Sequence, residues 1–229
     1  SVSSPPPMVI TLDGPAGSGK STLARRLAAR LGFEYLDSGA YYRAAAWLVR
    51  DRGIDPGNAQ AVARAIEGAT LHVRSGPDGP RIEVDGRDVS RLIRSPDVEA
   101  IVSRVAAIRE VRQAVVRRIR EDAGPRDLVA DGRDMGTVVF PDAGAKFFVT
   151  ATVEERARRR TSELAERGFS RPYPAVMEEM SRRDRQDETR DIAPLRKADG
   201  AIEIDTTGRT VEDLLDFIEA SVRPMPRGV

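Results

Sequence analysis

Residues 14–21 read Gly-Pro-Ala-Gly-Ser-Gly-Lys-Ser, and their types and spacing could bind the phosphates of a nucleotide. They fit the pattern G-x-x-x-x-G-K-[ST], in which glycines let the backbone turn so that successive N–H groups point at phosphate oxygens. Lys20 would bring a mobile positive charge to the β- and γ-phosphates, and the Ser21 hydroxyl would bind Mg²⁺. We therefore predict that ATP or GTP binds here. The predicted contacts are Gly14, Pro15, Ala16, Gly17, Ser18, Gly19, Lys20, Ser21 and Thr22.

Further charged residues could form a second anion site. Residues 37–43 read Asp-Ser-Gly-Ala-Tyr-Tyr-Arg, and residues 131–136 read Asp-Gly-Arg-Asp-Met-Gly. Arg183, Asp187 and Arg190 are spaced to share one face of a helix. A small-molecule kinase needs such a site, because positive charge must hold the acceptor and the transferred phosphate together. The alternatives are a solvated salt-bridge face for the trio, a plain turn for 131–136, and core packing for the two tyrosines.

Other classes of phosphate-loop protein fit the sequence less well. A guanine-specific switch usually carries Asn-Lys-x-Asp, but the one asparagine of this chain, Asn58, has no lysine beside it. Large ATPase motors need arrays or partner domains that 229 residues barely accommodate. Both observations favour a kinase that acts on a small molecule.

The elements that must position these residues follow an α/β pattern. Short apolar runs predict strands at 9–12, 33–36, 127–130, 145–149 and 201–204. Helical spacing of apolar residues predicts helices at 20–31, 39–51, 96–122, 153–167, 174–189 and 211–222. Strands that alternate with helices predict an open, mainly parallel sheet, with the ligand site at the carboxyl ends of its strands.

The middle of the chain interrupts this alternation. Two alternating segments, 71–74 and 81–84, flank a Gly/Pro turn at 75–80, which predicts an antiparallel hairpin. At about 150 residues for a domain, the chain length suits one core with a sizeable insertion. We therefore predict a core of residues 1–62 and 108–229, interrupted by an insertion at 63–107.

Composition limits the partners and the location. The net charge of +1 argues against a global basic field for nucleic acid or a membrane. No apolar run approaches the length of a membrane span, and residues 1–7 lack the features of a secretory signal. The chain has no cysteine, which suits a reducing compartment. We expect a cytoplasmic protein with no nucleic-acid or membrane partner.

The chain resembles the bacterial cytidylate (CMP) kinases, a family of nucleoside monophosphate (NMP) kinases. The segments that carry the resemblance are 10–20, 36–43, 131–141 and 183–195, and the match extends from about 9 to 222. The phosphate loop is generic, whereas Asp-Gly-Arg-Asp-Met-Gly-Thr-Val-Val-Phe-Pro at 131–141 is much more specific. The resemblance implies a three-layer P-loop α/β fold with a parallel core sheet, an NMP-binding insertion that contains a small antiparallel sheet, and a short lid at about 154–170.

The resemblance also implies roles for individual residues. Arg43 and Arg133 would hold the CMP phosphate, and Arg183 and Asp187 would reach the ribose hydroxyls. The residues that would face the cytosine are Ser38, Ser103, Arg112, Asp134 and Arg190. Tyr42 and Asp131 complete the predicted substrate site. The predicted catalytic residues are Lys20, Arg133, Arg156, Arg159 and Arg160. Which of the last three contacts the transferring phosphate stays open, because 154–167 also has the pattern of a plain charged helix.

The predicted reaction is phosphorylation of CMP and dCMP by ATP with Mg²⁺. The attacking phosphate is already anionic at neutral pH, because the second pKa of a phosphate monoester is near 6. No strong general base is needed, and the single histidine, His72, lies in the predicted insertion. UMP should be a poor substrate, because a site built for one base edge leaves a buried group unpaired against the other. The alternatives are a kinase for UMP, AMP or a non-nucleotide acid, or an ATP-binding regulator without activity. We expect a monomer.

Overall fold

The structure is a computed structural model and describes residues 7–74 and 80–222. The chain divides into two compact units. The first unit contains residues 1–35 and 125–229, and the second contains residues 36–124.

The first unit is built on a five-stranded sheet in the order β2-β6-β1-β7-β8. Its elements are β1 (Val9–Asp13), α1 (Lys20–Leu31), β6 (Leu128–Gly132), η2 (Met135–Val139), β7 (Ala145–Thr150), α6 (Val153–Glu166), α7 (Tyr173–Thr189), β8 (Ile202–Asp205) and α8 (Val211–Val222). The chain passes from the first unit to the second within β2 (Glu34–Asp37). β1 pairs in parallel with β6 and β7, and β7 pairs in parallel with β8. The predicted parallel α/β sheet is therefore confirmed.

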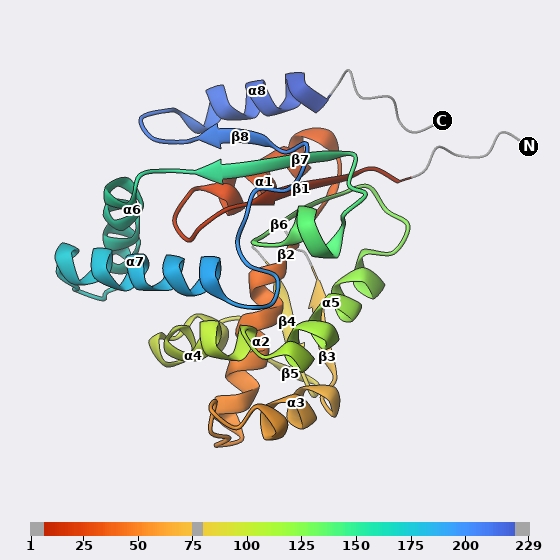
Figure 1. The fold of residues 1–229 in the computed structure, drawn as a ribbon, viewed down its shortest axis with the longest axis vertical. Coiled ribbons are helices and arrows are strands. Elements are labelled where there is room, and N and C mark those ends of the chain that lie inside the picture. The colour runs from red at the N-terminus through yellow and green to blue at the C-terminus, as the bar shows by residue number, and fades with distance from the viewer. Residues whose placement is uncertain (1–6, 75–79, 223–229) are drawn as a thin grey trace, which may run out of the picture. The chain divides into compact units, whose positions relative to one another are not determined.

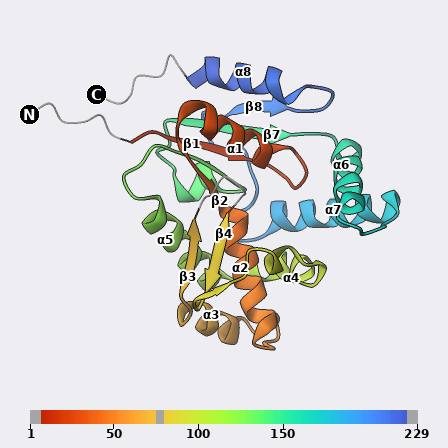
Figure 2. The same cartoon turned by 180° about the vertical axis from the view of Figure 1, so that it is seen from behind.

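The apolar pattern of the strands builds the core of the first unit. Ile10, Leu12 and Phe147 are buried in the sheet and pack with Leu23 and Leu27 from α1. Helix α1 lies across the sheet with α8 beside it (Figure 2), and α6 lies against α7 (Figure 1). The register pairs Asp13 of β1 with Gly132 of β6. The residue before the phosphate loop and the segment that contains Arg133 are thereby side by side.

The second unit surrounds a long buried helix. Its elements are α2 (Ser38–Asp51), α3 (Ala59–Glu67), β3 (Leu71–Arg74), β4 (Arg81–Val84), β5 (Arg87–Asp88), η1 (Leu92–Arg94), α4 (Pro96–Ala106) and α5 (Arg109–Ala123). Asp37 caps the start of α2, because its carboxylate accepts a hydrogen bond from the backbone N–H of Ala40 at 3.1 Å. The strand order is β3-β4-β5, and β3 and β4 form the predicted antiparallel hairpin. Residues 75–79 of the predicted turn lie outside the described residues.

One predicted helix is wrong, because residues 96–122 form two helices instead of one. Ile108 adopts an extended backbone between α4 and α5, although the break contains neither glycine nor proline. The guanidinium of Arg112 donates to the carbonyl of Ala106 at 3.0 Å, so a side chain satisfies a carbonyl at the end of α4. The sequence pattern also missed α3, β5 and the two short turns η1 and η2.

The second unit is larger than the predicted insertion of residues 63–107. It begins at residue 36 and ends at residue 124, because α2, α4, α5 and the small sheet pack on one another. The binding role of the insertion and of the lid stays a prediction. Within the described residues, no helix is both long and apolar enough to cross a membrane.

Candidate active site

The phosphate loop, residues 14–21, joins β1 to α1 in the first unit. A Cβ at Gly14 would lie 2.0 Å from the carbonyl oxygen of Val149, so only glycine fits there. Gly17 and Gly19 have φ angles of 74° and 89°, in the region that favours glycine. The glycines of the motif therefore set the course of this loop.

The start of α1 is suited to an anion. Gly19 occupies the N-cap position, where a glycine has no side chain to cap the N–H groups of the first turn. Lys20 is buried, and its ammonium donates to the carbonyl oxygen of Pro15 at 3.2 Å, which folds the lysine back over the loop. Thr22 is exposed on the first turn of α1. Backbone N–H groups, the helix dipole and one ammonium thus favour phosphate at this point.

The hydroxyl of Ser21 joins the loop to the carboxyl end of β6. It donates to Oδ2 of Asp131 at 2.5 Å, and the hydroxyl of Tyr35 donates to Oδ1 of the same carboxylate at 2.9 Å. Hydroxyl and carboxylate oxygens are ligands that Mg²⁺ accepts, together with phosphate oxygens and water. The described residues contain no cluster of three or more acidic, histidine or cysteine side chains that could hold a metal ion. Ser21 and Asp131 therefore fit a Mg²⁺ ion that arrives with a nucleotide.

Two arginines of α6 brace the phosphate loop. Arg156 is buried, and it forms a two-pronged pair with Asp184 of α7, at 2.6 and 3.1 Å, and donates to the carbonyl oxygen of Ala16 at 3.2 Å. Arg159 donates to the Thr206 hydroxyl at 2.9 Å, and that hydroxyl donates to the carbonyl oxygen of Ser18 at 2.8 Å. These contacts join the loop to α6, α7 and the end of β8.

Arg160 lies on α6 in a different environment. It pairs with Glu163, one turn along its own helix, at 2.9 Å, and both side chains are partly exposed. This pair would be easy to exchange, because exposed pairs on one helix stabilise by only about 0.3–0.5 kcal/mol. Of the three predicted lid arginines, Arg160 has the side chain that is most readily redirected.

A carboxylate surrounded by three arginines lies in the same unit. Asp187 is buried on α7, and its Oδ2 accepts from Nε of Arg133 at 2.6 Å. Its Oδ1 lies 3.6 Å from Arg190. Burial would raise the pKa of Asp187, but the charges of Arg133, Arg183 and Arg190 lower it below its usual value. The predicted trio thus has a buried carboxylate between two half-buried arginines and is not a fully solvated face.

Arg190 reaches this group by a route that differs from the prediction. Helix α7 ends at Thr189, and Arg190 has an extended backbone just beyond it. Its Nε donates to the carbonyl oxygen of Ala193 at 2.7 Å, which fixes the side chain after the helix end. Asp134, which directly follows Arg133 in the sequence, is also buried.

Asp13 is a buried carboxylate that the sequence reasoning did not select. Its two oxygens accept from the backbone N–H groups of Met135 and Gly136, both at 2.8 Å. Burial raises the pKa of Asp13 to about 7, although the hydrogen bonds from Gly136 and Met135 lower it. Asp134 raises it further, and Lys20 lowers it. The only available signal was an acidic residue at the end of a strand, directly before a phosphate loop.

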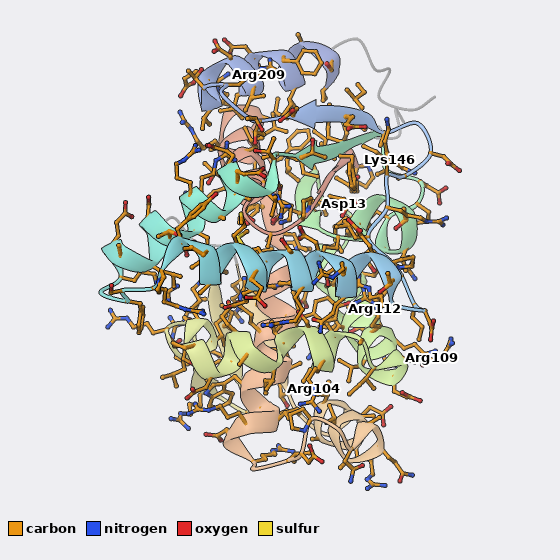
Figure 3. All side chains as sticks on the ribbon, turned by 60° about the vertical axis from the view of Figure 1, so that its left-hand side comes forward. Asp13, Arg104, Arg109, Arg112, Lys146 and Arg209 are labelled. Atoms are coloured by element: carbon orange, nitrogen blue, oxygen red, sulfur yellow. The ribbon has the colours of Figure 1, made fainter. Side chains whose placement is uncertain are left out.

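The second unit brings together the other predicted substrate residues in two groups. Arg43 pairs with Asp37 at 2.9 Å, and Arg94 lies 3.7 Å from the same carboxylate. Arg112 is buried on α5 (Figure 3), and its guanidinium carbon lies 4.9 Å from the centre of the Tyr42 ring. Arg43 and Arg112 therefore belong to separate groups. Asp37 fixes the direction of the Arg43 guanidinium, and the Tyr42 ring supports that of Arg112.

Two predicted serines of the second unit have less defined surroundings. Ser38 is buried at the first position of α2, and Ser103 is half-buried on α4. Sequence reasoning missed Tyr35, Arg94, Asp184 and Thr206 as partners of the predicted site residues. Nothing local to these four positions marks them, since each contacts a residue distant in the chain.

Comparisons with known proteins agree on one family. The family model described as "Cytidylate kinase" matches residues 10–223. A cytidylate kinase of Carboxydothermus hydrogenoformans is 45% identical over 208 residues, which cover 91% of this chain and 94% of that protein. A bifunctional pantoate ligase/cytidylate kinase of Synechococcus sp. (strain CC9902) is 48% identical over 217 residues, which cover 94% of this chain. The match covers 44% of that relative, so the chain spans less than half the length of such bifunctional proteins.

A solved structure supports the fold alone. The crystal structure of an uncharacterized protein from Eubacterium ventriosum aligns with a TM-score of 0.54 at 12% identity. The alignment covers 95% of this chain and 99% of that chain.

Proposed function

Because the chain belongs to the cytidylate kinase family, we propose that it transfers the γ-phosphoryl group of ATP to CMP and to dCMP. The products are CDP or dCDP, with ADP. One observation carries the proposal beyond family membership. A single unit contains both a phosphate loop and a buried carboxylate surrounded by three arginines, which suits two phosphate-bearing ligands.

In the proposed reaction, a phosphate oxygen of CMP attacks the γ-phosphorus of ATP. The new P–O bond forms as the bond from the γ-phosphorus to the bridging oxygen of ADP breaks. The nucleophile is anionic near neutral pH, so no side chain has to remove a proton. What the protein must supply is positioning and neutralisation of the negative charge on the transferring group.

The donor half of this function rests on the phosphate loop. The backbone N–H groups of residues 14–21 bind the phosphates of ATP, and Lys20 leaves the Pro15 carbonyl to contact the β- and γ-phosphates. Ser21 and Asp131 would hold Mg²⁺, which would neutralise part of the phosphate charge when bound. Arg156 and Arg159 keep the loop in shape, and Arg160 exchanges Glu163 for the transferring phosphate.

The acceptor half uses the arginine group of the first unit. Arg133 binds the phosphate of CMP while Asp187 fixes the direction of its guanidinium. Asp187 and Arg183 contact the ribose hydroxyls, and Asp134 and Arg190 face the cytosine. A charged group that is already paired and buried needs little reorganisation when the substrate arrives, which favours catalysis.

In the second unit, Arg43 binds the acceptor phosphate and Arg112 binds the base. Asp37 holds Arg43 in the absence of substrate, and the Tyr42 ring supports Arg112 from one face. Ser38 and Ser103 supply hydroxyl groups for the cytosine. A set of donors and acceptors fixed for one pyrimidine edge leaves a buried group unpaired against uracil, at a cost of about 1–3 kcal/mol for each group.

An acceptor panel tests this function. The purified chain is incubated with ATP, Mg²⁺ and one of CMP, dCMP, UMP, AMP or GMP, and ADP formation is followed together with chromatography of the product. We expect rapid ADP release with CMP and dCMP, with CDP and dCDP as products. Preference for another monophosphate would overturn the proposed base contacts. ATP binding without transfer to any acceptor would instead favour a regulator. We propose that a monomer does this work, and sedimentation velocity during the same series tests that.

A further inference from the structure

Asp13 stands at the junction of the two halves of the proposed site. It is the last residue of β1, and Gly14, the first residue of the phosphate loop, follows it directly. Asp13 is 3% exposed, and Figure 3 labels its position within the first unit. Neither the sequence pattern nor the proposed function assigns a role to it.

Both oxygens of this carboxylate are used. Oδ1 accepts from the backbone N–H of Met135 and Oδ2 from that of Gly136, each at 2.8 Å. These two N–H groups belong to the first two residues of η2, which directly follows Arg133 and Asp134. Of the described residues it is Asp13, and not the adjacent Asp134, whose side chain caps this turn.

The turn that Asp13 caps is unusual. Residues of η2 form a π-helical turn, a conformation that is rare and frequently occurs at functional sites. The turn packs directly on β1, because a Cβ at Gly136 would lie 2.9 Å from the hydroxyl oxygen of Thr11. The backbone N–H of Gly14 also donates to the carbonyl oxygen of Gly132 at 3.3 Å. The start of the phosphate loop and the Arg133 segment are therefore joined at three points.

The chemistry of this contact requires a carboxylate. An asparagine offers one acceptor oxygen, and its NH₂ group would face the second backbone N–H instead of accepting from it. A buried ionised carboxylate is costly unless hydrogen bonds satisfy it. The raised pKa of Asp13 reflects that cost, which the fold tolerates at this one position of β1.

We propose that Asp13 is a positioning residue for phosphoryl transfer, which fixes Arg133 and Asp134 relative to the phosphate loop. This inference rests on the proposed function, in which the loop holds the donor and the Arg133 segment holds the acceptor. Asp13 touches neither substrate. It acts through the two backbone N–H groups of η2, and its loss should therefore weaken the acceptor side more than the donor side.

The test compares Asp13→Asn with Asp127→Asn. Asp127 makes the same kind of contact in the same unit, because its carboxylate accepts from the backbone N–H of Met8 at 2.6 Å, but it precedes β6 at the opposite end of the sheet. For Asp13→Asn we expect the KM for CMP to rise by about tenfold or more, with a lower kcat. The dissociation constant of ATP, measured by calorimetry without acceptor, should change by less than about threefold. Asp127→Asn should leave all three quantities unchanged.

Amide hydrogen exchange gives a readout that does not depend on activity. The N–H groups of Met135 and Gly136 should exchange faster in Asp13→Asn than in the wild type, and at the wild-type rate in Asp127→Asn. If Asp13→Asn does not fold, the wild type alone suffices, since the amides of Met135 and Gly136 should exchange much more slowly than solvent-exposed amides when both are bonded to the carboxylate. Fast exchange of both amides in the wild type would overturn the proposal.

Other outcomes of the comparison are equally decisive. An unchanged KM for CMP and unchanged protection of the two amides in Asp13→Asn would overturn the positioning role. Equal losses of ATP and CMP affinity, matched by a fall in thermal stability, would assign Asp13 to general structure. Failure of the wild type to phosphorylate CMP would overturn the proposed function, whereas the exchange rates would still decide whether Asp13 holds η2.

Discussion

The phosphate loop and the group around Asp187 prepare for anions in different ways. The loop presents backbone N–H groups at the start of a helix, with Lys20 as its main side-chain charge. The Asp187 group consists of side chains, in which the charges of three arginines act on one carboxylate. A backbone site has its geometry before the ligand arrives, whereas the paired arginines keep their directions through a carboxylate of the protein. Anion binding at the phosphate loop should therefore depend on its glycines and on Lys20. Anion binding at the Asp187 group should depend on every charged side chain in the group.

The largest effect should come from the one mobile charge of the phosphate loop. Lys20→Met keeps the length and the apolar stem of the side chain but removes the ammonium. We expect kcat to fall by about 10³-fold, because a donor that meets developing charge on the transferring group is lost. Thermal stability should change little. Steady-state assays with saturating CMP and ATP measure this.

Lys197→Met is the matched control, because Lys197 pairs with Glu203 at an exposed site. It should retain wild-type kcat. If Lys20→Met kept more than about a tenth of the activity, the backbone N–H groups of the loop would suffice to bind the donor phosphates. The loop would then need no side-chain charge, unlike the Asp187 group.

Asp13 connects the two regions and gives the next effect, a dependence of stability on pH. Its pKa is about 7 in the folded chain and 3.8 is the ordinary value, so the folded state binds the extra proton between these limits. The free energy of unfolding should therefore fall as pH rises from about 4 to about 7, by at most about 4 kcal/mol from this group. Asp13→Asn has no such group, so its stability should fall less over the same range.

Urea unfolding of both proteins at several pH values measures the difference. Activity should change with pH in the direction opposite to stability. Ionisation of Asp13 lowers the free energy of unfolding, yet it provides both carboxylate oxygens that accept from the N–H groups of η2. Parallel stability profiles for the two proteins would show that Asp13 is already ionised at low pH, which would contradict the raised pKa.

The arginines of α6 divide into braces and a mobile charge, and substitution should separate them. Arg156→Ala removes the buried partner of the half-buried Asp184 and should lower the free energy of unfolding by about 3 kcal/mol. Arg160→Ala should leave stability unchanged but lower kcat by about tenfold, because it removes charge from the transferring phosphate. Urea unfolding and steady-state kinetics distinguish the two.

Arg158→Ala is the control for both substitutions. Three arginines of α6 pair with a glutamate of the same helix, and Arg158 is the most exposed of them. It should change neither quantity. A loss of kcat in Arg156→Ala without loss of stability would return Arg156 to the catalytic role that the sequence resemblance implied.

Asp187→Asn tests the charge balance of the acceptor side. The substitution preserves shape but removes the charge that anchors Arg133, so the KM for CMP should rise by about 10²-fold. The loss should be smaller for dCMP if Asp187 also contacts the ribose hydroxyl that dCMP lacks. Asp191→Asn, at an exposed position just beyond α7, is the control and should behave as the wild type. Equal losses for CMP and dCMP would remove Asp187 from the 2′ position.

The same contrast explains which parts were predictable from the sequence. The loop and its flanking strand and helix obey local rules, and the predicted boundaries of α1 agree with the structure. The partners of Asp13 and Arg133 lie 122 and 54 residues away, and no local pattern can pair them. The split between α4 and α5 was missed because the structure ends α4 with a carbonyl that accepts from Arg112, where local rules look for glycine or proline.

The smallest effect concerns Asp131, whose carboxylate accepts from the phosphate loop and from a residue outside it. Ser21 of the loop and Tyr35 both donate to Asp131, so Tyr35→Phe removes one neutral donor and leaves the other. Asp131 keeps its charge and its hydrogen bond from Ser21, so the Mg²⁺ concentration that gives half of the full ATP affinity should rise only about two- to tenfold. Ser21→Ala should raise it more, because that hydroxyl is also the proposed ligand. Calorimetric titrations of ATP at several Mg²⁺ concentrations measure both.

Tyr173→Phe is the control, because it removes a hydroxyl that donates to the carbonyl oxygen of Glu154, and it should leave the Mg²⁺ dependence unchanged. If Tyr35→Phe matched that control, Asp131 would be held by Ser21 and the fold alone, and the donor side would be independent of Tyr35.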